Sequence, residues 1–277
     1  MGMASNLKYE EGVTRAFVEG VQMSFSRYKG AMRDEYLNRI HPERALTGFT
    51  KLSGTVTFYS FVKSLMRNRG VERVLDFGAG RGAFAETGTA WLRELQDLRQ
   101  YGAEVWAADI DEAVTAHPAS HHQVIIDHPS ELPFEASFFD LIVSDFTFEH
   151  LRDPGSSADE LLRVLKPGGI VCARTPNRYG YVKLFSQLLP NRLHIRALRF
   201  VQPHRRAEDV FPTTYGLNSV GAVQKAFPGC AVFWYRDSAE PAYHFGSALL
   251  YRSLRFVHKL LPDLLSTTIC FFVVKPE

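Results

Sequence analysis

A nine-residue segment constrains the fold of this chain more than any other part of its sequence. Residues 74–82 read Val-Leu-Asp-Phe-Gly-Ala-Gly-Arg-Gly, and a helical stretch follows them. An apolar strand therefore passes an acidic residue and enters a turn with glycine at alternate positions. Glycine lets the backbone turn sharply and approach a ligand that a β-carbon would exclude. This order of strand, glycine turn and helix predicts an α/β sheet that binds a ligand at the turn.

The spacing within this segment indicates the charge of the ligand. In a dinucleotide-binding fingerprint the third glycine follows the second by three residues, and a pyrophosphate binds at the helix N-terminus. Here Gly78, Gly80 and Gly82 are spaced more tightly, and Asp76 would face a pyrophosphate as a buried like charge. A carboxylate beside a glycine turn instead suits a cationic ligand.

Apolar strands and helical stretches alternate beyond this turn, which predicts a parallel α/β sheet. We expect strands at residues 73–77, 104–108, 123–126, 139–144, 170–174, 231–235 and 268–274. We expect helices at residues 83–100, near 112, and at 157–165, 219–226 and 246–261. The spacing of apolar residues also predicts helices ahead of the first strand, over 12–39 and 50–69.

The second predicted strand ends in two acidic residues. An open α/β sheet binds its ligand at the carboxyl ends of its strands, and a carboxylate there can accept hydrogen bonds from both ribose hydroxyls of a nucleoside. We assign that role to Asp109 and expect Asp111 to cap the next helix, although a helix cap is the alternative for Asp109 too. Asp109 follows Gly78 by 31 positions, compared with about 20 in a nucleotide-binding unit, so the intervening helix and its exit must be longer.

Further motifs follow in an order that is typical of one family. Residues 126–142 contain Ile-Asp-His, Leu-Pro-Phe and Phe-Phe-Asp-Leu-Ile, residues 144–150 contain Ser-Asp-Phe and Glu-His, and residues 161–169 read Leu-Leu-Arg-Val-Leu-Lys-Pro-Gly-Gly. With the glycine turn, which resembles motif I, these motifs make residues 71–177 resemble the class I S-adenosylmethionine-dependent methyltransferases, in particular the small-molecule, type 11 members. The resemblance implies S-adenosylmethionine as cofactor.

The resemblance also implies which residues bind the cofactor. Asp127 would accept a hydrogen bond from the adenine amino group, while His128 would contribute its main chain. The cofactor-binding residues that we expect are Asp76, Gly78, Ala79, Gly80, Asp109, Ile110, Asp127, His128, Ser144 and Asp145. No histidine or cysteine lies at ligand spacing from His128, so we expect no metal site.

The predicted fold class is therefore α/β, with a Rossmann-like, doubly wound, mostly parallel sheet of seven strands. We expect a helical N-terminal extension or cap over residues 1–70 and a methyltransferase domain over 71–277. Insertions at about 175–215 and 237–266 are expected to form a lid over the substrate.

Methyl transfer from a sulfonium needs a general base only when the acceptor loses a proton, as a hydroxyl does. The candidate catalytic residues are His150, which follows the fourth strand, His204 in the expected lid, and Tyr215, which would orient the acceptor. A structural hydrogen-bonding role is the alternative for His150. We expect a small-molecule acceptor and methylation at oxygen, on a saccharide, lipid-linked or natural-product intermediate.

The expected lid is rich in basic residues. Residues 174–206 contain no Asp or Glu but several Arg, interleaved with aromatic and leucine side chains. This composition suits an anionic or lipid-linked acceptor, bound by Arg178, Tyr181, His204 and Arg205, although a solvated basic face is the alternative. Residues 246–261 combine a leucine stripe with basic residues, so that they would either contact a membrane surface or pack on the sheet.

Bulk properties narrow the class of protein further. The net charge of +2 gives no argument for nucleic acid, and motifs of nucleic-acid methyltransferases are missing. Cys172, Cys230 and Cys270 are widely spaced and lie in apolar runs, a pattern typical of buried, reduced thiols. We therefore expect a cytoplasmic protein, with peripheral membrane contact as an option. The alternatives are a non-catalytic nucleoside-binding protein of the same fold and a dinucleotide-dependent oxidoreductase. The sequence predicts no oligomeric state.

Overall fold

The computed structural model describes residues 35–181, 213–238, 240–241, 244 and 246–277, and predictions for other residues lie outside the described part. Seven strands form one sheet in the order β3-β2-β1-β4-β5-β7-β6. Neighbouring strands from β3 to β5 are parallel, and β7 is antiparallel to both β5 and β6. The predicted doubly wound, mostly parallel seven-stranded sheet is confirmed.

The strands lie close to their predicted positions. They are β1 (Arg73–Phe77), β2 (Glu104–Asp109), β3 (His122–Ile125), β4 (Phe139–Asp145), β5 (Leu165–Pro176), β6 (Ala231–Asp237) and β7 (Thr268–Val274). The α-helices with both ends in the described part of the chain are α2 (Pro42–Thr47), α3 (Gly54–Arg69), α4 (Ala90–Gln96), α5 (Pro154–Val164), α8 (Val220–Ala226) and α9 (Ala248–Leu260). Short 3-10 helices are η1 (Ala83–Glu86), η2 (Gln100–Gly102), η3 (Glu112–Ala116) and η5 (Asp263–Leu265).

The helix predicted over residues 83–100 is not continuous. It is divided into η1, α4 and η2, because Gly88 takes a φ of 71° and Thr89 starts α4 anew by accepting a hydrogen bond from the Leu92 backbone N–H. The extra turns explain the long interval between Gly78 and Asp109. The prediction of a longer connection is right, but that of a single helix is wrong.

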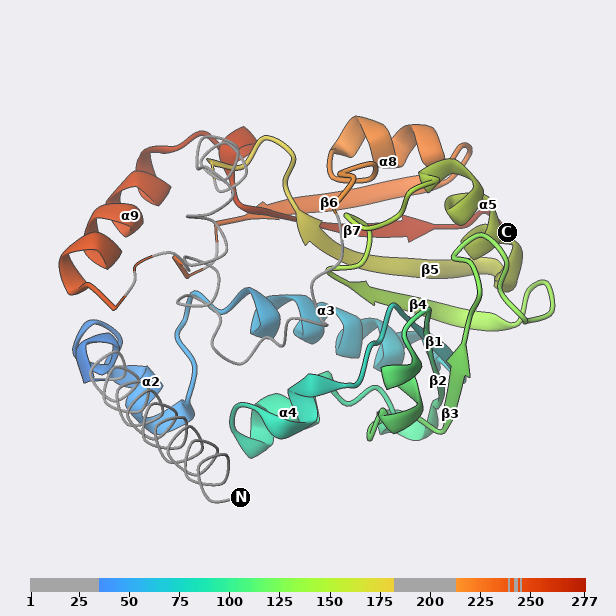
Figure 1. Cartoon of the computed structure of the whole chain (residues 1–277), viewed down its shortest axis with the longest axis horizontal. Coiled ribbons are helices and arrows are strands. Elements are labelled where there is room, and N and C mark those ends of the chain that lie inside the picture. Colours follow the sequence, from blue (N-terminus) through green and yellow to red (C-terminus); the bar gives the residue numbers. More distant parts are fainter. Residues whose placement is uncertain (1–34, 182–212, 239, 242–243, 245) are drawn as a thin grey trace, which may run out of the picture.

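Helices cover both faces of the sheet (Figure 1). On one face, Phe58, Val62 and Met66 of α3 are buried against side chains of the central strands, among them Val74 and Leu141. On the other face, α5 and α8 pack on a second cluster that includes Phe139 and Phe271. Helix α3 therefore belongs to the core of the sheet, although it precedes the predicted domain boundary at residue 71.

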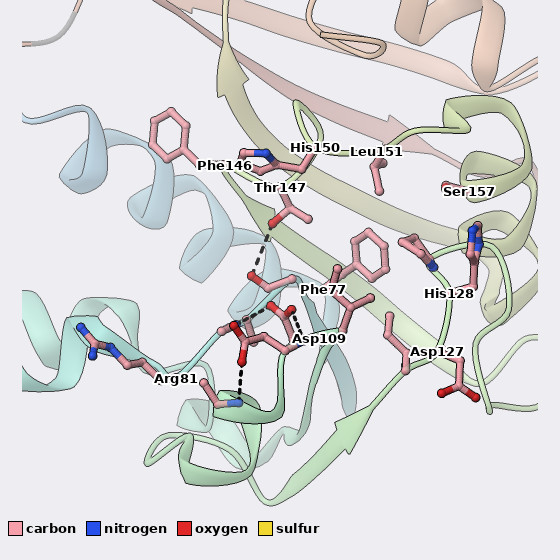
Figure 2. A pocket seen from close by; sticks show the side chains of 18 of the residues that line it. Phe77, Arg81, Asp109, Asp127, His128, Phe146, Thr147, His150, Leu151 and Ser157 are labelled. Carbon is pink, nitrogen blue, oxygen red and sulfur yellow. Dashed lines mark hydrogen bonds between the residues drawn. The ribbon is translucent and has the colours of Figure 1, made fainter. Parts of the chain in front are cut away.

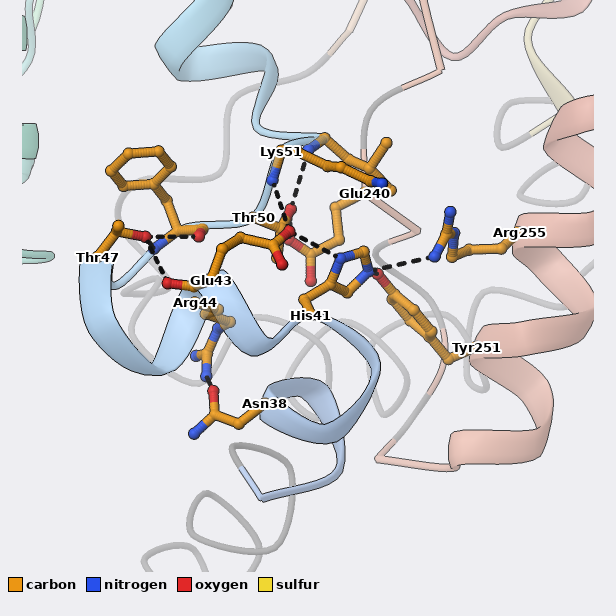
Figure 3. A network of polar contacts seen from close by, with 12 residues as sticks. Asn38, His41, Glu43, Arg44, Thr47, Thr50, Lys51, Glu240, Tyr251 and Arg255 are labelled. Atoms are coloured by element: carbon orange, nitrogen blue, oxygen red, sulfur yellow. Dashed lines mark hydrogen bonds and ion pairs between the residues drawn. The ribbon is translucent and has the colours of Figure 1, made fainter.

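Helices α2 and α9 lie together beyond the carboxyl ends of β4 and β5 (Figure 1). The Tyr251 hydroxyl and His41 Nε2 are 2.7 Å apart, and Thr50 Oγ1 donates to the Glu240 carboxylate at 3.2 Å (Figure 3). These contacts join the segment before α3 to the insertion between β6 and β7. Among the described residues, no helix is both long enough and apolar enough to cross a bilayer.

Candidate functional site

The glycine turn after β1 needs its glycines for two different reasons. Gly78, Gly80 and Gly82 have φ values of 75°, 53° and 66°, in the left-handed region that favours glycine. A β-carbon on Gly78 would lie 2.2 Å from the Thr147 hydroxyl oxygen, and one on Gly82 would lie 2.8 Å from the His117 ring. A β-carbon on Gly80 would meet no protein atom within 4 Å. Gly78 and Gly82 thus permit close packing, whereas Gly80 borders open space.

That open space belongs to a cavity of about 580 Å³ at the point where the strand order reverses between β1 and β4 (Figure 2). Its wall combines the glycine turn with residues that follow β2, β3 and β4. The lining residues include Gly78, Ala79, Gly80, Asp109, Ile110, Asp127, His128, Phe146, Thr147, His150 and Arg152. An open α/β sheet binds its ligand at this switch point.

Asp109 joins β2 to the glycine turn. Its carboxylate accepts hydrogen bonds from the backbone N–H groups of Gly80, at 2.8 Å, and Asp111, at 3.0 Å (Figure 2). Burial raises the pKa of Asp109, an effect that these N–H groups oppose. Asp111 accepts from the Ala113 N–H at 2.9 Å and caps η3, so its predicted capping role is confirmed.

Asp76 belongs to β1, two residues before Gly78, and is not among the residues that line the cavity. Its side chain is 16% exposed, and its nearest ion-pair contact in the described part of the chain is His117 Nε2, at 3.8 Å. Burial, together with the negative charges of Asp145 and Asp109, raises the pKa of Asp76 to about 7. Burial also lowers the pKa of His117, so this histidine is a poor counter-ion. The site therefore holds buried negative charge that a cationic ligand would stabilise.

These features fit S-adenosylmethionine. The open space beside Gly80 accommodates a ligand close to the backbone, and the acidic residue at the end of β2 suits the two hydroxyls of a ribose. The uncompensated Asp76 carboxylate suits the positive charges of the methionine portion. When bound, this cofactor supplies an activated methyl group. The role of each individual residue stays a prediction.

The end of β4 differs from the expected pattern of cofactor contacts. Arg174 donates to both carboxylate oxygens of Asp145, at 2.7 and 2.6 Å, and Ser144 is fully buried. Neither Ser144 nor Asp145 lines the cavity. The wall is formed instead by Phe146, whose φ is 57° and whose ring centroid lies 4.7 Å from the Arg174 guanidinium carbon. The ion pair beneath Phe146 therefore supports the segment that enters the cavity.

His150 lies on the cavity wall (Figure 2), and its Nε2 is 4.0 Å from Oε1 of the buried Glu149. Thr175, at the end of β5, donates to the other oxygen of Glu149 at 3.0 Å, and Asn218 donates to the Thr175 hydroxyl at 2.7 Å. A buried polar chain thus leads from Asn218 to the cavity. Sequence reasoning missed Thr175 and Asn218 as members of this chain, since they lie far from His150 in sequence.

The remaining candidate residues do not line the cavity or lie outside the described part of the chain. The Tyr215 N–H donates to the Glu149 carbonyl at 3.2 Å, but Tyr215 does not line the cavity. Arg178 is exposed, and the Tyr181 hydroxyl lies 2.5 Å from His258 Nε2 of α9. His204 and Arg205 lie outside the described residues. Within the described ranges, no group of three or more His, Cys, Asp or Glu residues is arranged to hold a metal ion.

Comparisons with known proteins identify the family of this chain. The family model described as "Methyltransferase domain" matches residues 45–208, more than half of the chain, and its match begins ahead of α3. A Mycolicibacterium smegmatis protein, named as a probable S-adenosylmethionine-dependent methyltransferase, is 31% identical over 143 residues, which cover 50% of this chain and 52% of that protein. The ubiquinone biosynthesis O-methyltransferase of Pseudomonas aeruginosa is 30% identical over 151 residues, covering 48% of this chain and 59% of that enzyme.

The solved structure of a SAM-dependent methyltransferase from Aquifex aeolicus is similar with a TM-score of 0.43 and 14% identity, covering 87% of this chain and 97% of that one. The chain spans about half the length of the curated relatives it matches. The family match favours a methyltransferase over the dinucleotide-dependent oxidoreductase. The chain belongs to the class I S-adenosylmethionine-dependent methyltransferase family.

Proposed function

We propose that this protein transfers a methyl group from S-adenosylmethionine to a hydroxyl oxygen of a small molecule. The observation that carries the proposal is the position of His150, which shares one cavity with the glycine turn and Asp109 and is backed by Glu149. The acceptor belongs to the saccharide, lipid-linked or natural-product class. A lipid-linked acceptor is the first to test, because one relative is named as an O-methyltransferase of ubiquinone biosynthesis.

Methyl transfer to a hydroxyl requires the protein to hold the acceptor beside the methyl donor and to supply a base for the hydroxyl proton. Methyl transfer is an in-line substitution, so holding the acceptor in line and excluding water supply much of the catalysis. The bound cofactor would supply the methyl group, and the His150 imidazole would take the proton that the acceptor hydroxyl loses. The Glu149 carboxylate, at ion-pair distance, stabilises the resulting imidazolium. Thr175 holds the other oxygen of that carboxylate and so keeps it oriented.

The cavity wall also favours an acceptor with both apolar and anionic parts. Ile110, Phe146 and Leu151 provide apolar surface, and Arg152 provides a positive charge on the same wall. Apolar walls with a few placed polar groups are typical of small-molecule sites. The Arg152 guanidinium would bind a carboxylate or phosphate of the acceptor.

The proposal is tested first by binding and then by turnover. Calorimetry is expected to detect S-adenosylhomocysteine but not NAD. A methyl-transfer assay against hydroquinones, catechols, sugar phosphates and amines is expected to show turnover with a hydroxyl acceptor. His150→Gln should then lower kcat by roughly 10²- to 10⁴-fold, because the general base is lost, and leave the affinity for S-adenosylhomocysteine nearly unchanged.

His128→Gln is the matched control, since His128 lies on the same cavity wall, its Nδ1 pairs with the Ser130 hydroxyl at 2.6 Å, and only its main chain is expected to contact the cofactor. Its kcat is expected to stay within about threefold of the wild-type value. Equal kcat values for wild type and His150→Gln would reject His150 as the base. Binding of S-adenosylhomocysteine without transfer to any acceptor in the panel would support the non-catalytic alternative.

A further inference from the structure

Helix α9 carries an apolar stripe that faces away from the protein. Leu249, Phe256 and Leu260 are 77%, 63% and 67% exposed. They follow one another at intervals of seven and four residues, which places them on one side of the helix. Single exposed apolar residues are ordinary on a protein surface, but a stripe along one helix marks a contact surface.

The opposite side of α9 is held by the protein, so the orientation of the stripe is determined. Tyr251 is fully buried and pairs with His41 at 2.7 Å, with Arg255 beside it (Figure 3). His258 pairs with the Tyr181 hydroxyl at 2.5 Å. These contacts fix one side of α9 against α2 and against the segment after β5. The apolar stripe therefore cannot turn inward without breaking buried polar contacts.

The charges around the stripe indicate what it contacts. Arg252 and Lys259 are exposed, and each follows a stripe residue by three positions, so that both cations flank the stripe. Helix α9 contains no Asp or Glu. In a symmetric contact between two copies, stripe against stripe, these cations would approach the cations of the other copy, and like charges repel. Apolar residues flanked by cations instead match a membrane interface with anionic headgroups.

We propose that α9 binds the surface of an anionic membrane. Leu249, Phe256 and Leu260 enter the boundary between headgroups and acyl chains, while Arg252 and Lys259 contact lipid phosphates. Because α9 lies beyond the carboxyl ends of β4 and β5 (Figure 1), docking would bring the side of the sheet that holds the cavity toward the membrane. The proposal does not depend on methyl transfer.

Co-sedimentation with vesicles tests the proposal on the full chain. Vesicles of phosphatidylcholine with roughly one-third phosphatidylglycerol should bind the wild-type protein, and vesicles of phosphatidylcholine alone should bind it at least about tenfold more weakly. Phe256→Ser should weaken binding to the anionic vesicles by about tenfold. Arg252→Gln combined with Lys259→Gln should lower binding to the anionic vesicles to the level seen with phosphatidylcholine.

Phe233→Ser is the matched control, because Phe233 lies on β6 and is 60% exposed, close to the value for Phe256. It should bind vesicles as wild type does, and thermal unfolding should show that all variants fold. Wild-type protein left in the supernatant with anionic vesicles would overturn the proposal. Equal losses for Phe233→Ser and Phe256→Ser would overturn the assignment to α9. The wild-type protein could instead be a dimer that binds no vesicles and that Phe256→Ser converts to a monomer. In that case the stripe would contact a second copy of the chain and not a membrane.

Discussion

Asp109 and Asp111 lie two residues apart at the end of the same strand, yet their surroundings differ. The carboxylate of Asp109 is buried at the edge of the cavity and receives the Gly80 and Asp111 N–H groups. The carboxylate of Asp111 caps η3 through the Ala113 N–H. Both residues line the cavity, but the Asp111 carboxylate is used as a helix cap, which leaves the Asp109 carboxylate as the candidate acceptor for the ribose hydroxyls.

The first prediction separates these two carboxylates. Asp109→Asn should weaken the binding of S-adenosylhomocysteine by roughly 10- to 100-fold, because charge-assisted hydrogen bonds to the ribose are lost. Asp111→Asn should change the affinity by less than about threefold, since Asn is as good a helix cap as Asp. Isothermal titration calorimetry measures both. Unchanged affinity in Asp109→Asn would show that the ribose assignment is wrong.

We expect Asp76 to couple cofactor binding to pH. Its pKa in the folded protein is about 7, above that of an ordinary aspartate, so the folded state favours the protonated form. The stabilising effect of this proton is complete below the ordinary aspartate pKa and is lost as the pH rises through 7. Affinity for a cationic cofactor changes in the opposite direction, because only the ionised carboxylate attracts it.

The second prediction follows from this coupling. The affinity of the wild-type protein for S-adenosylmethionine should rise between pH 6 and pH 8, over the range about 7 where Asp76 ionises. Asp76→Asn should bind weakly at both pH values and, without cofactor, should raise the Tm at pH 8 by about 3 °C or more. Calorimetry and thermal unfolding test the two effects. A variant that retains the wild-type pH dependence of affinity would contradict the role of Asp76.

At the scale of single elements, the sheet could be predicted well and the connections less well. The strands β1 and β7 have their predicted bounds because short apolar runs bounded by turn residues have a strong local signal. The broken helix before β2 depends on Gly88 and on the cap at Thr89, whose effect exceeds that of the apolar spacing around them. Helix α3 was predicted, but its place in the core depends on contacts with strands that follow it in sequence.

The third prediction tests whether α3 is part of the core. Phe58→Ala should lower the free energy of unfolding by about 3–5 kcal/mol, because Phe58 is fully buried against the sheet and its loss leaves a cavity. Phe61→Ala should cost only ~1 kcal/mol, since Phe61 is on the same helix but is 49% exposed beside Tyr235 and Phe272. Urea unfolding measures both values. If Phe58→Ala lowered the free energy of unfolding as little as Phe61→Ala does, α3 would be a detachable extension rather than part of the core.

At the scale of the whole molecule, residues from both ends of the described chain meet beyond the sheet. His41 and Tyr251 are separated by 210 positions and are both buried, with their side chains hydrogen-bonded (Figure 3). Tyr36 and His244 hydrogen-bond beside them. The segment before α3 and the insertion that contains α9 therefore form one unit at the same end of the sheet as the cavity.

The fourth prediction tests that unit. Tyr251→Phe removes the hydroxyl that pairs with buried His41 and should accelerate backbone hydrogen exchange in α2 and α9 together by roughly 10-fold, with little change in the sheet. Tyr101→Phe, at a half-exposed tyrosine, should change neither helix. Hydrogen exchange followed by mass spectrometry resolves these segments. Faster exchange in only one of the two helices would show that they are not coupled.

The sequence by itself determined the fold class, the glycine turn and the acidic residue after β2, because each depends on local backbone geometry or on the alternation of strands and helices. It also indicated His150 through its position after β4. The tertiary structure alone decided that Glu149, Thr175 and Asn218 stand behind that histidine, and that Asp145 pairs with Arg174 rather than lining the cavity. These contacts join residues from different strands and loops, and burial against distant partners has no local signal in the chain.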